Sequence, residues 1–415
     1  MALIRAAILL LPLASGIIGC TVKTPGTNSM LAVRRGPPVL ELPTWADPPS
    51  PEASEVLGQG QPVGFAVLNP EGHAISMTRH PDRGPVEIWE ATPFPVSDVV
   101  SVIDADLIGS VTGRIAIIEV APSDPRAGQP VPRRRAVDGL LFQPAETGND
   151  RLAVILGSLA RFNPGERWMT EAFLRDGWSV LVSSPPINSP DAVTRGRTRV
   201  APGVDPDRAG RMLGVEFDVA IGSWAVGLAA ILRQFDADGL IPTGPMVLVG
   251  MSSGGLAAPA IAAALDPIRP TAAAALIATG VDPALIIART SLGDEDLRIQ
   301  RTGPRISHQD LPRFVESYHR ESRLDGEDLD EWFADRPILI LEAGFDAAIP
   351  AESRRQLRQR HPKAAYWWLP TGHYGLFAAL LREATRVVEW FDPRMIAVDG
   401  TVERADSNGP AEEKR

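Results

Sequence analysis

From about Val131 to Arg394, short apolar segments alternate with longer segments of helical character. This alternation constrains the fold more than any other feature of the chain. Each apolar run has the length of a strand buried on both faces, and the intervening segments are long enough to cross over a sheet. The pattern therefore predicts an α/β fold with a mostly parallel, doubly wound sheet. The expected strands are 136–142, 152–156, 178–182, 245–249, 271–278, 338–341 and 366–369, and the expected helices are 170–177, 216–235, 255–265 and 376–391.

One segment interrupts this rhythm. About sixty residues separate the strand at 271–278 from the next strand, whereas an ordinary crossover is shorter. The segment is charged and has helical character at 295–301, 311–320 and 327–333. We expect a helical cap insertion at about 283–336, above the carboxyl edge of the sheet, where insertions usually form lids or substrate pockets. The alternative is a solvated surface excursion.

The chain before residue 131 is organised differently. Residues 20–61 are rich in Pro, Gly and Ser, and we interpret them as an extended tether. Residues 62–130 contain short strand-like runs separated by turn signals, which predicts a small β-rich N-terminal extension. The α/β domain then spans 131–394, and the polar tail at 395–415 is expected to be disordered. The strand-like runs of the extension are 64–68, 86–89 and 114–120.

Residues 1–19 have the composition of a secretory signal, in which Arg5 precedes a short apolar core. Cys20, the only cysteine, closes a segment Ile-Ile-Gly-Cys that resembles a bacterial lipobox, whose cysteine is lipidated and becomes the mature N-terminus. Thr21 follows it, which by resemblance to enterobacterial sorting favours the outer membrane or cell surface over the inner membrane. We expect an exported protein that is attached to a membrane through acyl chains on Cys20. The alternative is a plain signal peptide that contains a cysteine.

Composition and motifs exclude several other classes of function. The net charge of −10 argues against nucleic acid as a partner. No H-E-x-x-H motif and no Cys/His cluster occurs, so no metal is expected. Neither G-x-G-x-x-G nor G-x-x-x-x-G-K-[ST] occurs, which leaves no signal for a nucleotide. We therefore expect no cofactor.

The segment 250–254 reads Gly-Met-Ser-Ser-Gly, a G-x-S-x-G motif centred on Ser252. An apolar strand precedes it and an Ala-rich helix follows it, which is the setting of a nucleophile elbow. The small residues suit a tight turn, because they tolerate strained backbone and close approach of helix and strand. The sequence thus predicts that Ser252 is a nucleophile.

An activated serine needs a base, and the base needs an acid that orients it. Of the six histidines, His373 alone directly follows a late strand; His319, in the cap, remains an outside candidate. The acid should follow the preceding strand, where Asp346 lies on the loop and Glu342 lies at the strand end. We favour Asp346, since Glu342 is better placed to support the turn.

The order Ser252, Asp346, His373 is that of the α/β-hydrolases. From about Ala136 to Arg394 the chain resembles this family, in the elbow, in the acid loop Gly-Phe-Asp-Ala-Ala-Ile-Pro and in the late Thr-Gly-His. The resemblance implies a catalytic triad and an oxyanion hole of two backbone N–H groups. One is that of Ser253. The second comes from the loop after the strand at 152–156, and is that of Ser158 or of Leu159. Many relatives carry His-Gly at this loop, where this chain has Leu-Gly.

These residues predict a serine esterase that acts on a small-molecule ester or acyl substrate through an acyl-enzyme. A serine peptidase is the weaker alternative, because residues 62–130 could hold barely one blade of the propeller that prolyl oligopeptidases carry. Acyl transfer uses the same residues with another acceptor. The alternative of a different class is a hydrolase-like binding lipoprotein without catalysis. Trp367, Trp368 and Phe162 could line an acyl pocket, although aromatic residues beside a strand more often belong to the core.

Overall fold

The computed structural model describes residues 77–79, 86–91, 103–120, 133–146, 148–159, 163–186, 198–200, 205–292, 299–301, 306–325 and 327–399. The signal segment, Cys20, the tether and the predicted strand at 64–68 lie outside these residues. What the sequence predicts for them therefore stays a prediction.

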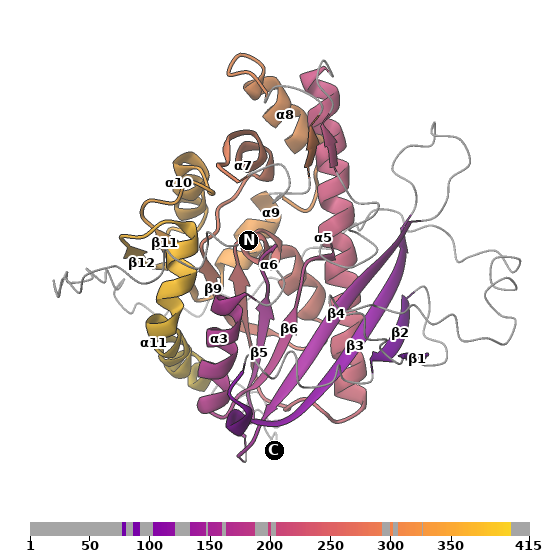
Figure 1. Ribbon diagram of the computed structural model, residues 1–415, viewed down its shortest axis with the longest axis vertical. Helices are drawn as coiled ribbons and strands as arrows, with labels where there is room; N and C mark the ends of the chain where they lie inside the picture. Colours follow the sequence, from indigo (N-terminus) through magenta and orange to yellow (C-terminus); the bar gives the residue numbers. More distant parts are fainter. Residues whose placement is uncertain are drawn as a thin grey trace, which may run out of the picture.

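A ten-stranded sheet runs through the molecule (Figure 1) in the order β1-β2-β3-β4-β6-β5-β8-β9-β11-β12. The strands β6, β5, β8, β9, β11 and β12 are parallel to one another. The strands β1 to β4 pair antiparallel, and β4 also pairs antiparallel with β6. With helices on both faces, this sheet confirms the predicted α/β-hydrolase type of fold. The strands are β1 (Met77–Arg79), β2 (Val86–Ala91), β3 (Ile108–Val120), β4 (Arg133–Pro144), β5 (Leu152–Leu156), β6 (Ser179–Ser183), β8 (Met246–Met251), β9 (Thr271–Ile277), β11 (Ile338–Ala343) and β12 (Ala365–Leu369).

Helices cover both faces of the sheet and enclose its central strands. In β5, β6, β8, β9 and β11 every residue is buried, as expected for parallel strands with a helix layer on each side. One face packs against α3 and α11, which contribute Phe173 and Phe391, and the other packs against α5, α6, α9 and α10. These helices are α3 (Pro164–Arg175), α5 (Pro206–Ala237), α6 (Ser253–Leu265), α9 (Glu327–Ala334), α10 (Ala351–Arg360) and α11 (His373–Asp399).

Part of the expected N-terminal extension continues the main sheet. β3 pairs with β4 along its whole length, and β2 pairs with β3 on its other side. The expected boundary between residues 130 and 131 therefore separates two strands that pair with each other. A short 3-10 helix, η1 (Ala105–Leu107), precedes β3.

The helices α5 and α11 extend well beyond their predicted ends, and α3 begins at Pro164, six residues before its predicted start. α5 begins at Pro206, which occupies its first turn, about ten residues before the predicted start. Its first turns carry Ala209 and Leu213, which pack on the cap and not on the sheet. α11 passes through Pro393 and ends at Asp399, so the prediction that residues 395–399 belong to a disordered tail is wrong. Proline commonly ends a helix, but here the helix continues past it.

The cap between β9 and β11 is mostly helical, as predicted, with one exception. It contains α7 (Pro283–Arg289), α8 (Leu311–Glu321) and α9, and α8 lies along the upper end of α5 (Figure 1). The prediction of a helix at 295–301 is wrong for residues 299–301, which form the strand β10 (Ile299–Arg301). β10 pairs in parallel with β7 (Thr198–Val200), about a hundred residues earlier in the chain, and this distant partner overrides the local helical preference.

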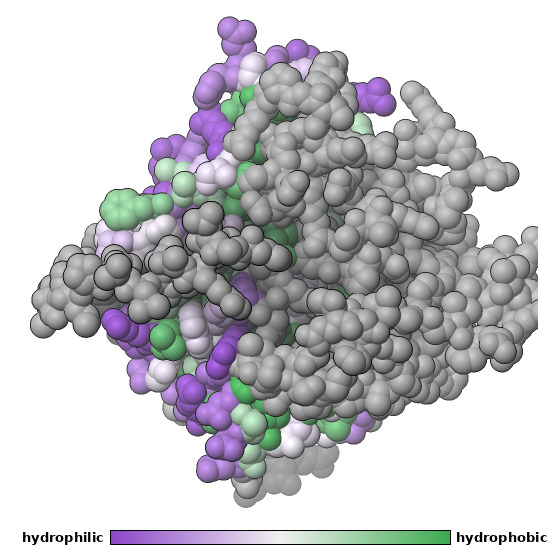
Figure 2. All heavy atoms as spheres, in the orientation of Figure 1, coloured by the Kyte–Doolittle hydropathy of each residue, from purple (hydrophilic) through white to green (hydrophobic). Residues whose placement is uncertain are grey.

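Close packing holds the cap helix α8 against α5. A Cβ at Gly210 would lie 2.2 Å from the carbonyl oxygen of Phe314, so only glycine permits this approach. Hydrophilic side chains gather at the top of the molecule, where α8 lies (Figure 2). Within the part of the chain that the structure describes, no helix is long and apolar enough to cross a membrane.

Candidate active site

Ser252 stands on a strained turn between β8 and α6. Its backbone has φ 52° and ψ −110°, a conformation that residues other than glycine rarely adopt. The turn is held by two hydrogen bonds: the Ser252 N–H donates to the Ile277 carbonyl at 2.8 Å, and the Thr279 hydroxyl donates to the Ser252 carbonyl at 2.9 Å. Backbone strain of this kind persists only where the surroundings enforce it, and it lifts the serine side chain out of the strand.

Position 254, two residues after the serine, requires a glycine for a steric reason. A Cβ at Gly254 would lie 2.1 Å from the Leu156 carbonyl oxygen, a backbone atom that cannot yield. The elbow therefore packs directly against the end of β5 and the loop that follows it. This contact places Ser252 beside the loop from which a second oxyanion donor is expected.

His373 and Asp346 meet Ser252 at the carboxyl edge of the sheet. The Ser252 Oγ lies 3.3 Å from His373 Nε2, and His373 Nδ1 lies 2.7 Å from Asp346 Oδ2. Asp346 follows β11, and His373 is the first residue of α11, which follows β12. The three side chains therefore come together in the order and from the places that the sequence predicted.

Backbone N–H groups hold the Asp346 carboxylate in place independently of its contact with the histidine. Its Oδ1 accepts hydrogen bonds from the N–H groups of Ala348 and Ile349, both at 2.8 Å, which leaves Oδ2 directed at His373. Its side chain is completely buried. A buried, hydrogen-bonded carboxylate beside the imidazole suits the role of an orienting acid.

The rival acid and the rival histidines lie elsewhere. Glu342 accepts hydrogen bonds from Arg354, with Nη1 to Oε1 at 2.6 Å, and from Arg358. His319, in the cap, has its Nε2 3.4 Å from the Asp282 carboxylate. His361 is buried after α10 against Phe333, with ring centroids 6.0 Å apart. His308 is exposed on the turn before α8, and His73 and His80 lie outside the described residues.

Aromatic side chains flank the histidine. The rings of Tyr374 and Phe377 lie 5.6 Å and 5.3 Å from that of His373, both edge to face. Tyr374 and Phe345 are about two-thirds exposed, at 68% and 69%, so both stand at the surface beside the acid and the base. Trp368 is also exposed, at 43%, and its ring lies 6.1 Å from that of Phe345.

Trp367, which the sequence suggested for an acyl pocket, has other surroundings. Trp367 packs on the core, and the Arg386 guanidinium lies 4.9 Å from its ring centroid. This environment agrees with the expectation that an aromatic residue beside a strand belongs to the core. Phe162 lies outside the described residues.

The loop after β5 faces the elbow, and its N–H groups have different partners. The Ser253 hydroxyl donates to the Gly157 carbonyl at 3.4 Å, which ties this loop to the first turn of α6. The Ser158 N–H donates to Glu166 Oε1 at 2.7 Å. Among the described residues, the N–H groups of Ser253 and Leu159 have no acceptor.

Sequence reasoning missed Glu166 and its partner Asn163. Asn163 caps α3, and Glu166 stands three residues later in a reciprocal capping box. The signal was present as Asn-Pro-Gly-Glu at 163–166, a cap residue followed three positions later by glutamate. The predicted start of the helix at residue 170 left this signal unused.

No described group of three or more His, Cys, Asp or Glu side chains could hold a metal ion.

Comparisons with known proteins find a weak similarity to solved esterases. No protein-family model and no curated protein matches the chain. The structure is similar to a cold-adapted esterase from an Arctic intertidal metagenomic library, at 18% identity and TM-score 0.40, covering 69% of this chain and 95% of that one. It is also similar to Est1E from Butyrivibrio proteoclasticus, at 16% identity and TM-score 0.40, covering 67% and 99%. An esterase from Pyrococcus furiosus is similar at 15% identity and TM-score 0.41, covering 67% of this chain and 91% of that one. Similarity this low transfers neither a substrate nor a residue's role to this chain.

Proposed function

We propose that this protein is a serine hydrolase that cleaves a carboxylic ester, with Ser252 as nucleophile, His373 as base and Asp346 as orienting acid. The observation that carries the proposal is the chain of contacts from Ser252 Oγ to His373 Nε2 at 3.3 Å and from His373 Nδ1 to Asp346 Oδ2 at 2.7 Å. All three residues are more than nine-tenths buried, which strengthens electrostatic interactions among them.

In the first half of the reaction, Ser252 Oγ forms a bond with the carbonyl carbon of the ester, and its proton passes to His373 Nε2. The tetrahedral intermediate collapses, the bond to the alcohol oxygen breaks, and the alcohol leaves with the proton from His373. The product is an acyl-enzyme on Ser252. Asp346 accepts the Nδ1–H hydrogen bond throughout and stabilises the imidazolium that forms.

In the second half, water replaces the alcohol. His373 removes a proton from the water as its oxygen attacks the acyl carbonyl, and then returns the proton to Ser252 Oγ as the carboxylic acid departs. The negative charge on the intermediate in each half is stabilised by backbone N–H groups, each worth roughly a hundred- to a thousandfold in rate. Ser253 supplies one of them, since it opens α6 where N–H groups have no partner within the helix.

An active-site fluorophosphonate tests the nucleophile. We expect wild type to be labelled and Ser252→Ala to remain unlabelled. Ser253→Ala is the matched control: it removes the neighbouring hydroxyl, retains the backbone N–H and should still be labelled. Labelling of Ser252→Ala, or no labelling of wild type while folded, would overturn the proposal.

The class of bond cleaved needs a second experiment. A panel of p-nitrophenyl esters and peptide p-nitroanilides, assayed with and without an added alcohol acceptor, separates ester hydrolysis, peptide hydrolysis and acyl transfer. We expect cleavage of the esters and free acid as the product. Preference for the anilides, or transfer of the acyl group to the alcohol at the expense of free acid, would replace the esterase proposal with one of its two alternatives.

We propose further that the domain is exported and attached to the outer membrane or cell surface through acyl chains on Cys20. The support is the sequence alone: a signal-like segment that ends at the only cysteine of the chain. Metabolic labelling with palmitate tests this proposal. Label should enter wild type and be absent from Cys20→Ala, and label that survives the substitution would contradict it.

A further inference from the structure

The Glu166 carboxylate lies at the inner end of the loop that follows β5. Glu166 belongs to the first turn of α3 and is completely buried. Its Oε1 accepts a hydrogen bond from the Ser158 N–H at 2.7 Å and from Asn163 Nδ2 at 3.0 Å, and its Oε2 accepts one from the Asn163 N–H at 3.1 Å. A buried carboxylate with three such donors is well anchored.

The loop itself is held from three sides. The Gly157 N–H donates to the Ser183 carbonyl at 2.9 Å, which attaches the loop to β6. The Ser253 hydroxyl attaches the Gly157 carbonyl to the elbow, and Asn163 Nδ2 donates to Ser158 Oγ at 2.6 Å. Because Glu166 is a carboxylate, its hydrogen bond from the Ser158 N–H is stronger than the bonds between neutral groups that hold the loop.

The contact decides between the two candidate oxyanion donors. An N–H that already donates to a buried carboxylate is a poor donor to a second anion, because the two negative charges would repel each other and the existing bond would have to break. The Ser158 N–H is in this position. The Leu159 N–H, one residue further along the same loop, has no acceptor among the described residues.

We propose that Glu166 is a positioning residue, which binds the Ser158 N–H and thereby presents the Leu159 N–H as the second donor of the oxyanion hole. This inference rests on the proposed function and deepens it. The loop here carries Leu156-Gly157 where many relatives carry His-Gly. The inference accounts for this difference, because the Glu166 carboxylate on α3 anchors the loop.

Substitution of Glu166 tests its positioning role. In Glu166→Ala we expect kcat for a p-nitrophenyl ester to fall by about a hundredfold with KM changed less than about threefold, as expected when a donor to the transition state is displaced. Affinity for a trifluoromethyl ketone, whose adduct with Ser252 carries an oxyanion, should fall in parallel with kcat/KM. Glu166→Gln should retain most of the wild-type kcat, since its amide oxygen can still accept from the Ser158 N–H.

The matched control is Glu171→Ala. Glu171 is a buried carboxylate on the same helix, but it pairs with Arg167 and Arg175 and does not contact the loop. We expect this variant to lose stability and to retain its kcat per folded molecule. If Glu166→Ala, folded by circular dichroism, kept the wild-type kcat, or if both variants lost kcat equally, the positioning role would be refuted.

Replacement of single amides by esters tests the donor directly. Incorporation of the α-hydroxy acid analogue at position 159 removes that N–H and keeps the side chain, and we expect kcat to fall by about a hundred- to a thousandfold. In the Glu166→Ala background the same replacement at position 158 should cost less than about tenfold, because the hydrogen bond that it would break is already absent. The reverse order, or equal losses, would reject Leu159 as the donor. Wild type must be labelled by fluorophosphonate in the same experiment, so that failure of this inference is distinguished from failure of the serine hydrolase proposal.

Discussion

His373 Nδ1 lies 2.7 Å from Asp346 Oδ2, although the two residues belong to loops that follow different strands. The strands β11 and β12 are adjacent and parallel, so their carboxyl ends lie at the same edge of the sheet. The Phe345 N–H also donates to the Thr371 carbonyl at 2.9 Å, which fastens one loop to the other. The position of the acid relative to the base is therefore a property of the sheet and of this cross-loop bond.

Removal of the acid should affect turnover far more than folding. In Asp346→Asn the amide would present a different set of donors and acceptors to the imidazole and favour the wrong tautomer, so kcat should fall by about three to four orders of magnitude. Glu342→Gln is the control, because it removes a buried charge that faces Arg354 instead of His373. We expect Glu342→Gln to lower the melting temperature and to retain most of the activity. Steady-state kinetics of the two purified variants would contradict the assignment if their effects on kcat were reversed.

Asp325, a buried carboxylate in the cap between α8 and α9, should make the protein less stable as pH rises. Burial raises the pKa of Asp325 from 3.8 to about 7, against the opposing effect of Arg360 at 3.6 Å, while Asp330 adds to the rise. Because the folded state then binds more protons than the unfolded state between about pH 4 and 7, the free energy of unfolding falls as pH rises through this window. Asp325→Asn should remove that fall and stabilise the protein at pH 8, by on the order of a few kcal/mol. Denaturant unfolding at pH 5 and pH 8 measures this change in the free energy of unfolding. An equal change with pH in wild type and variant would refute the prediction.

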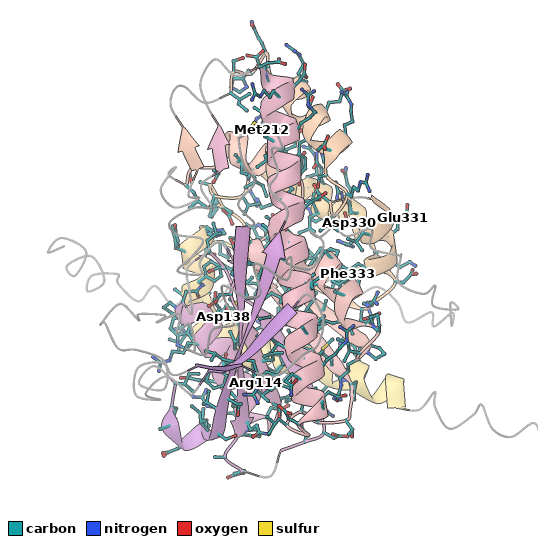
Figure 3. All side chains as sticks on the ribbon, turned by 90° about the vertical axis from the view of Figure 1, so that its right-hand side faces the viewer. Arg114, Asp138, Met212, Asp330, Glu331 and Phe333 are labelled. Atoms are coloured by element: carbon teal, nitrogen blue, oxygen red, sulfur yellow. The ribbon has the colours of Figure 1, made fainter. Side chains whose placement is uncertain are left out.

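His361 should contribute a slope of the opposite sign. Burial, together with Arg360, lowers the pKa of His361 from 6.5 to about 4. The folded state therefore binds fewer protons than the unfolded state between about pH 6.5 and 4, and stability is lost as pH falls. His361 packs on Phe333, which lies on α9 beside Asp330 (Figure 3). In His361→Gln we expect a lower overall stability but a smaller loss between pH 6.5 and 4, measured by urea unfolding. A slope identical to that of wild type would show that the native histidine titrates normally.

The architecture was accessible from the sequence because the central strands are buried on both faces. Short continuous apolar runs such as 152–156, placed between longer helical segments, are typical of buried parallel strands, and the structure places β5 on those residues. The order Ser252, Asp346, His373 then identified three residues that the sheet brings together. These inferences needed only local composition and the rule that ligands and catalytic groups gather at the carboxyl ends of strands.

The features that the sequence did not predict depend on contacts between distant segments. The strand β10 exists because β7 pairs with it, and nothing in Ile299–Arg301 alone distinguishes it from a helix. The first turns of α5 were missed because their apolar residues face the cap and not the sheet. The choice between Ser158 and Leu159 could not be made from the sequence, because it depends on a hydrogen bond to a helix that begins after the loop.

The covalent intermediate offers the most direct test of the central claim. Wild type mixed with a p-nitrophenyl ester and quenched with acid should carry one acyl group per molecule, and peptide mapping by mass spectrometry should place it on Ser252. His373→Ala, which lacks the base, should carry almost none on the same timescale. An acyl group on another residue, or turnover of the ester without any acylation of Ser252, would contradict the account.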